Sequence, residues 1–150
     1  MPTELVPKQV TVEDLRAAFK RAGVKLTPQR LEIYREVAAS REHPDAERIF
    51  QGVRLRLPTI SLDTVYRTLW MFIDKGLITT LGLPQGRMRF DANMERHHHF
   101  VCTRCGAAHD FYAEHFDTLP LPPAVHGFGD VTETHVEVRG LCSRCLQQQV

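Results

Sequence analysis

Two Cys-x2-Cys pairs constrain the fold of this 150-residue chain more than any other sequence feature. Cys102 and Cys105 form the first pair, Cys142 and Cys145 form the second, and the chain has no other cysteine. Each such turn presents two thiolates to one ion, so two turns complete a tetrahedral, structural zinc site. The 36 residues between the pairs (106–141) exceed the usual gap of a zinc ribbon, which places a larger piece of fold between the turns.

Two disulfides or a redox-active pair are the alternative interpretations of these cysteines. The first thirty residues alternate charged and apolar side chains and lack the apolar stretch of a secretory signal. We therefore expect a cytoplasmic protein, in a reducing compartment where structural disulfides are rare. No apolar run approaches the roughly 20 residues that cross a bilayer, so no membrane partner is expected. These expectations favour zinc.

Charge and metal-binding residue types divide the chain into two parts. Residues 1–90 carry 15 Lys and Arg against 10 Asp and Glu, whereas residues 91–150 carry 4 against 8 and hold seven of the eight histidines. A composition of 43% hydrophobic and 25% charged residues is that of a globular protein. We expect two domains, residues 1–88 and residues 89–150, with the boundary region between residues 85 and 95.

Helical patterns fill the first part of the chain. The start signals, in chain order, are Thr11 with Asp14, Thr27-Pro28, Pro44-Asp45 and Ser61. A β-prone run over Leu77–Leu81, turn residues from Gly82 to Gly86 and a return strand over Arg87–Asp91 follow. Helices followed by a hairpin are typical of a winged helix.

Short strands predominate beyond residue 97, which makes the whole chain α+β. Strands are expected at Phe100-Val101, at Phe111-Tyr112 and over Val131–Arg139, and a short helix over residues 113–119. The prolines that break any continuation of that helix are Pro120, Pro122 and Pro123.

Three consecutive histidines run into the first cysteine turn. In a strand His97 and His99 face one side and His98 the other. Imidazoles on one face bind Fe(II), Zn(II), Mn(II) or Ni(II), and Asp91 and Asp110 add oxygen donors. The pattern indicates a second, more labile metal site, with an exposed His-rich strand as the alternative.

The fourth expected helix carries small polar and basic residues on one side. Val65 and Leu69 mark its buried stripe, which leaves an outward face suited to the major groove of double-stranded DNA. The candidate DNA-binding residues are Thr64, Tyr66, Arg67 and Thr68. An ordinary solvated helix face is the alternative.

Several motifs occur together in the order of one family. They are Leu26-Thr27-Pro28-Gln29-Arg30, His43-Pro44, the segment from Ser61 to Leu69, Gly76-Leu77-Ile78, Arg89-Phe90-Asp91, His97-His98-His99 and both cysteine pairs. Over roughly residues 11–146 the chain resembles the ferric uptake regulator (Fur) family. The resemblance implies a homodimeric, metal-dependent transcriptional repressor, with N-terminal winged-helix DNA-binding domains and C-terminal α/β dimerisation domains.

The same resemblance implies the ligands of a regulatory Fe(II) or Mn(II) ion. The matching positions are His43, Asp91, His97, His99 and Asp110. Aspartate at position 110 is typical of the peroxide-responsive subgroup, in which iron-catalysed oxidation strikes ligand histidines; the matching positions are His43 and His97. Glutamate there is typical of iron-responsive members.

Many family members also have a second exchangeable-metal site. Two of its positions match His98 and Asp117, but Arg96 and Thr134 stand where its other two histidines are found. This departure puts the second site in doubt.

Three other functions are kept as alternatives. An iron-responsive regulator would lose DNA on iron depletion but not on peroxide exposure. A non-haem metalloenzyme needs an open coordination position and a general base, and no base lies in recognisable spacing with these ligands, so we expect no enzymatic activity. A zinc-ribbon interaction module would not explain the helical half.

Overall fold

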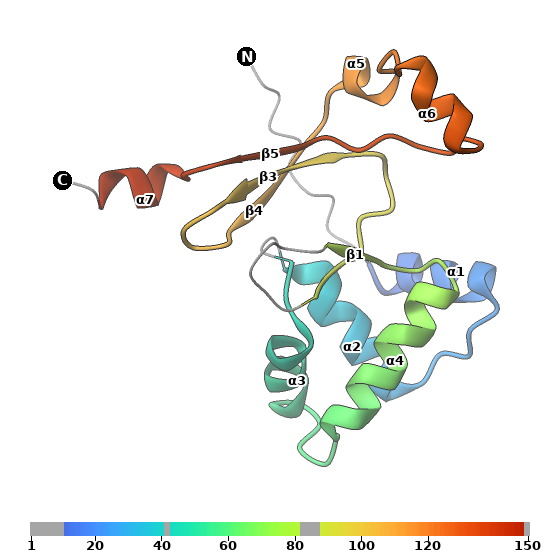
Figure 1. Cartoon of the computed structure of the whole chain (residues 1–150). Coiled ribbons are helices and arrows are strands. Elements are labelled where there is room, and N and C mark those ends of the chain that lie inside the picture. The colour runs from blue at the N-terminus through green and yellow to red at the C-terminus, as the bar shows by residue number, and fades with distance from the viewer. Residues whose placement is uncertain (1–10, 41–42, 82–87, 149–150) are drawn as a thin grey trace. The chain divides into compact units, whose positions relative to one another are not determined.

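The computed structural model describes residues 11–40, 43–81 and 88–148, which belong to two compact units, Met1–Met94 and Glu95–Val150 (Figure 1). The described part of the first unit contains helices α1 (Val12–Ala22), α2 (Pro28–Ala39), α3 (Ala46–Arg54) and α4 (Leu62–Asp74) and strands β1 (Thr79–Leu81) and β2 (Arg89–Asp91). The described part of the second unit contains β3 (His98–Cys102), β4 (Ala108–Phe111), α5 (Glu114–Asp117), α6 (Pro123–Phe128), β5 (Glu137–Gly140) and α7 (Ser143–Gln147). The fold is of the α+β class. Among the described helices none has the length and apolar character needed to cross a membrane.

Side-chain caps begin the first four helices where the sequence predicts them. Thr11 Oγ1 accepts a hydrogen bond from the Asp14 N–H, and the Asp14 carboxylate accepts one from the Thr11 N–H, which completes the capping box of α1. Thr27, Asp45 and Ser61 each accept the N–H three residues further on, at the starts of α2, α3 and α4. Local sequence therefore sets these four helix starts.

An aromatic triad lies in the core of the first unit. Phe19 of α1, Tyr34 of α2 and Phe72 of α4 contact one another edge to face, with ring centroids 5.5–5.8 Å apart. Val65 and Leu69 of α4 are also fully buried. This packing fixes which side of α4 faces away from the core.

The β1–β2 hairpin belongs to the first unit, because it packs against the helical core. β1 pairs antiparallel with β2, and the N–H of Phe90 donates to the carbonyl of Pro44 at 3.1 Å. Phe90 is buried in the helical core. The first compact unit therefore extends to Met94 and includes the whole of β2. The turn expected from Gly82 to Gly86, and Arg87, lie outside the described residues.

The second unit is built on a sheet of order β4-β3-β5, antiparallel between β3 and β4 and parallel between β3 and β5. The strand expected over Val131–Arg139 is shorter, because Val136 gives its N–H to the His98 side chain instead of to a strand ladder. Helix α6 was not expected, yet Pro123 is tolerated because it occupies a first-turn position.

We expect Phe72→Ala to destabilise the first unit by about 3–5 kcal/mol, because it removes a fully buried ring from the aromatic triad. Urea unfolding followed by circular dichroism measures the change. Trp70→Ala, at a half-exposed site on the same helix, is the control and is expected to shift stability by about 0.5 kcal/mol or less. Equal losses in the two variants would contradict this description of the core.

Candidate metal centres and recognition helix

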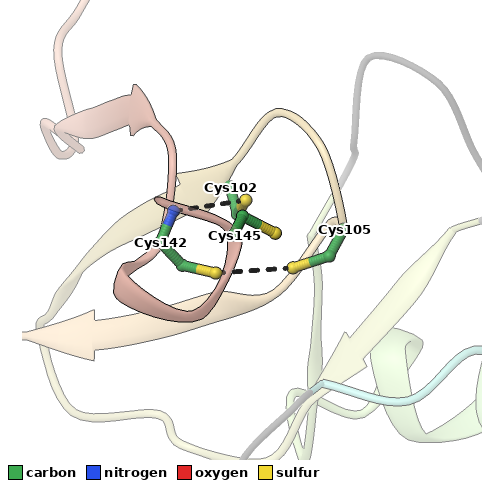
Figure 2. Close-up of side chains that lie close together, drawn as sticks. All are labelled: Cys102, Cys105, Cys142 and Cys145. Atoms are coloured by element: carbon green, nitrogen blue, oxygen red, sulfur yellow. Dashed lines mark hydrogen bonds between the residues drawn. The ribbon is translucent and has the colours of Figure 1, made fainter. Parts of the chain in front are cut away.

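The four cysteines converge at one end of the second unit (Figure 2). Cys102 ends β3, Cys105 lies in the turn before β4, and Cys142 and Cys145 lie at the start of α7 and within it. Their sulfur atoms all lie within 4.8 Å of one another, and none of the four forms a disulfide. Four thiol sulfurs at this spacing fit a tetrahedral zinc site without a vacant ligand position.

Backbone N–H groups point at two of these sulfurs. The Cys142 N–H donates to Cys102 Sγ at 3.3 Å, and this bond is the largest cause that lowers the pKa of the Cys102 thiol to about 5. The Ala107 N–H donates to Cys105 Sγ at 3.4 Å and lowers the pKa of Cys105. Burial has the opposite effect on Cys145 and raises its pKa to about 12. The site thus holds one thiolate ready at neutral pH and one thiol that stays protonated until a cation arrives.

The second donor cluster consists of residues of β3 and β4 together with His97, which directly precedes β3. His97 Nε2 is 3.1 Å from His99 Nε2, and Asp110 Oδ1 is 3.2 Å from His99 Nε2 and 3.8 Å from His97 Nε2. The antiparallel register places Asp110 directly opposite His99. Two imidazoles and one carboxylate therefore converge inside the second unit, as their alternation along the strand predicts.

His135 is a neighbour of this cluster that the sequence did not single out for it. Its Nε2 is 2.8 Å from His99 Nδ1, on the ring edge that does not face Asp110. Burial, followed by the neighbouring histidines, lowers the pKa of His135 and keeps its ring neutral at neutral pH. In the tautomer in which His99 Nδ1–H donates to His135 Nε2, the Nε2 lone pair of His99 is directed at a metal.

The two remaining predicted ligands lie in the first unit. His43 Nδ1 is 3.6 Å from Asp91 Oδ1, and both side chains are buried. Asp91 Oδ1 also accepts the N–H of Asn93 at 2.8 Å. His43 has a φ of 52°, in the left-handed region, although it precedes Pro44. Strain of this kind costs about 1–3 kcal/mol and is typical of functional positions. The five predicted ligands are thus divided, two in the first unit and three in the second.

The outward side of α4 differs in part from the expectation. Tyr66 is 42% exposed, and Arg67, whose side chain is 81% exposed, forms an ion pair with Asp63 at 3.0 Å. Thr64 is partly buried and its hydroxyl bonds to Ser61. Thr68 is 8% exposed, so the expectation that it faces outward is wrong: it lies beside Leu69 on the packed side of the helix.

Trp70 extends the exposed face of α4 by one helical turn beyond Tyr66. It is 52% exposed, and together with Tyr66, Met88 and Phe90 it lines a shallow hollow of about 100 Å³. Its residue type gave no signal in the sequence, because an apolar tryptophan on an amphipathic helix is normally assigned to the core.

Comparison with known proteins matches this arrangement to one class, the metal-dependent regulators of transcription. The sequence model of the ferric uptake regulator family matches residues 21–134, more than half of the chain. The chain belongs to the ferric uptake regulator family.

The relatives with curated names point to one branch of this family. The peroxide-responsive repressor PerR of Staphylococcus epidermidis is 35% identical over 149 residues, which is 99% of each chain. PerR of Staphylococcus aureus strain USA300 is 34% identical over 146 residues, covering 97% of this chain and 98% of that protein.

Solved structures share the fold. The ferric uptake regulator of Vibrio cholerae is 27% identical with a TM-score of 0.63, covering 86% of this chain and all of that chain. The Campylobacter jejuni peroxide stress regulator is 25% identical with a TM-score of 0.63, covering 89% and 98%.

We expect zinc binding to the cysteines to release protons and to weaken as the pH falls. Cys145, whose pKa burial raises to about 12, has to lose its proton to bind, whereas Cys102, with a pKa of about 5, is already a thiolate at neutral pH. At lower pH the cysteine sulfurs are protonated again, and this protonation competes with zinc binding. Competition with a chelator at about pH 6 and about pH 8 measures the affinity, and equal affinities would contradict the assignment.

Proposed function

We propose that this chain is a peroxide-responsive, metal-dependent transcriptional repressor that acts as a homodimer on double-stranded operator DNA in the cytoplasm. One observation carries the proposal. Two imidazoles and the carboxylate of Asp110 converge on one another in the second unit, apart from a four-cysteine cluster that suits structural zinc. The similarity to PerR proteins over almost the full chain supports the peroxide response.

The regulatory Fe(II) or Mn(II) would be held by donors of both units. His97, His99 and Asp110 come from the second unit, and His43 and Asp91 come from the first. Mixed nitrogen and oxygen donors suit Fe(II) and Mn(II), whereas the four sulfurs select zinc. One ion with ligands in both units would favour a single arrangement of the two units, a coupling typically of about 1–3 kcal/mol.

The peroxide response would reside in the ligand histidines. When bound, Fe(II) supplies the reduction of hydrogen peroxide, in which one oxygen atom enters an imidazole ring and the other leaves as water. His43 and His97 are the positions proposed to be oxidised. An oxidised ring binds metal poorly, so DNA would be released. The cysteines would be spared, because zinc-bound thiolates react more slowly than free ones.

The exposed side of α4 would contact DNA. Tyr66 and Arg67 extend from this helix into solvent, and Thr64 lies in its first turn. Arginine bonds guanine or phosphate, and tyrosine contacts a thymine methyl group. Thr68 is left out of this proposed interface because it is buried.

The dimer would form through the second unit. β5 is an edge strand in the order β4-β3-β5, and edge strands are open to pairing with another chain. Its Val138 is 42% exposed, and Phe128 of α6 in the same unit is 85% exposed. A second copy would cover these apolar side chains.

Arg67→Ala is expected to weaken operator binding by about 1–3 kcal/mol while leaving metal affinity unchanged, because Arg67 lies on the exposed face of α4. Gel shift with the metal-loaded protein and its own promoter measures this loss. Arg35→Ala, which removes a partly exposed arginine from α2, is the matched control. Unchanged binding in Arg67→Ala would show that α4 does not read DNA.

Peroxide exposure of the iron-loaded protein is expected to add one oxygen atom to the peptide containing His43 or His97 and to release DNA. The manganese-loaded protein, treated in the same way, is the control and is expected to stay unmodified. Peptide mass spectrometry locates the oxygen. Oxidation restricted to cysteine, or equal with both metals, would favour the iron-responsive alternative.

Asp110→Glu is expected to keep iron-dependent DNA binding and to respond less readily to peroxide. The longer side chain retains the carboxylate but moves it relative to His99 Nε2, from which Asp110 Oδ1 is 3.2 Å. The peroxide concentration that releases half of the DNA measures the response. An unaltered response would remove Asp110 as the residue that distinguishes the two sensing modes.

A further inference from the structure

A second polar cluster lies on the other side of β3 from His97 and His99. We name it the Asp117 corner; it consists of Arg96, His98, Asp117 and Thr134. His98 is fully buried, and its Nε2 is 2.9 Å from Asp117 Oδ1 at the end of α5. Two of these residues match positions of the second metal site that the family resemblance implies.

Hydrogen bonding fixes the tautomer of His98. The N–H of Val136 donates to His98 Nδ1 at 3.0 Å, so Nδ1 carries the lone pair and Nε2 carries the proton. That Nε2–H donates to Asp117 Oδ1. To bind a metal through Nε2, His98 would need a proton on Nδ1, where it would face the Val136 N–H donor. His98 therefore does not fit the role of a ligand.

A guanidinium group supplies the positive charge at this corner. Arg96 Nε is 3.7 Å from Asp117 Oδ1, and Arg96 Nη2 donates to Thr134 Oγ1 at 3.5 Å. The Thr134 hydroxyl in turn donates to the carbonyl of Phe116 at 3.3 Å. Arginine stays charged at every physiological pH, so a divalent ion would have to displace a permanent cation to reach Asp117.

We propose that the Asp117 corner is a metal-independent clamp, in which the Arg96 guanidinium takes the place of a second exchangeable metal ion. The clamp joins α5 to β3 and to the segment before β5 through Asp117, His98 and Thr134 (Figure 1). This part of the second unit keeps its arrangement at any metal concentration. Exchangeable metal would then act on this chain at one place only, and this inference does not depend on the peroxide response.

The first test counts exchangeable metal ions. The full-length, zinc-loaded protein is dialysed against Mn(II), and bound manganese is measured by mass spectrometry of the metals. We expect Asp117→Asn to bind as many Mn(II) ions per chain as the unaltered protein. Loss of one equivalent in Asp117→Asn, with unchanged circular dichroism, would overturn the proposal.

The second test rebuilds the absent site. Arg96→His combined with Thr134→His is expected to gain one Mn(II) equivalent per chain, and adding Asp117→Asn is expected to remove it again. The matched control, Arg139→His with Thr132→His, introduces the same residue types at exposed positions of the same unit and is expected to gain none. If the Arg96 and Thr134 variant gains no more than the control, the guanidinium does not occupy a metal position.

The third test measures the clamp without exchangeable metal. Arg96→Ala is expected to lower the melting temperature by about 2–5 °C, and Mn(II) in excess of the regulatory site is expected not to restore it. Arg139→Ala removes a similarly exposed arginine that pairs with Glu137 and is expected to change the melting temperature less. Equal shifts would show that Arg96 is an ordinary surface arginine.

Discussion

The convergence of four cysteine sulfurs is the constraint on which the second unit depends. The cluster around these sulfurs consists of the buried Cys102, Cys142 and Cys145 with the partly buried Phe100 and Leu141. Val101 and Ala108 are the other buried apolar residues among the described residues of this unit. A core this small does not offset the entropy of ordering three short strands and three short helices. Structural zinc contributes about 10–16 kcal/mol in small peptides, which is of the order of a whole domain's stability. The helical unit needs no such support, because its core is continuous and apolar.

The segment from His97 through β3 contributes residues to three separate sites, because successive side chains point to opposite faces of the sheet. His97 and His99 lie together near Asp110, while His98 points to Asp117, and the strand ends at Cys102. A shift of one residue in register would exchange the two faces and place His98 in the candidate regulatory site. The pairing of β3 with β4 on one side and β5 on the other fixes this register and keeps His98 out of the candidate regulatory site.

Under the proposed function, the two faces of β3 have different roles. On the face with His97 and His99, these imidazoles and the Asp110 carboxylate bind an exchangeable metal, and His135 orients His99 through its contact with His99 Nδ1. The face with His98 is occupied by fixed hydrogen bonds and the charge of Arg96. Such a sensor responds to one exchangeable ion, because the charge of Asp117 in the Asp117 corner is balanced by Arg96 and not by a metal.

Local patterns are enough to predict the starts of the first four helices, the hairpin strands, the four-cysteine site and the shared face of His97 and His99, because caps and strand alternation act over a few neighbouring residues. Features that depend on contacts between distant segments appear only in the folded chain. Thr68 is buried because the packed side of α4 is wider than its Val65 and Leu69 stripe suggests. Strand β5 begins only at Glu137, because the Val136 N–H bonds to His98, 38 residues away in the chain. The same bond fixes the His98 tautomer, and Arg96 meets Asp117 only when α5 lies beside β3. Hydrogen bonds between residues this far apart leave no periodic pattern in a sequence, so only the folded chain shows them.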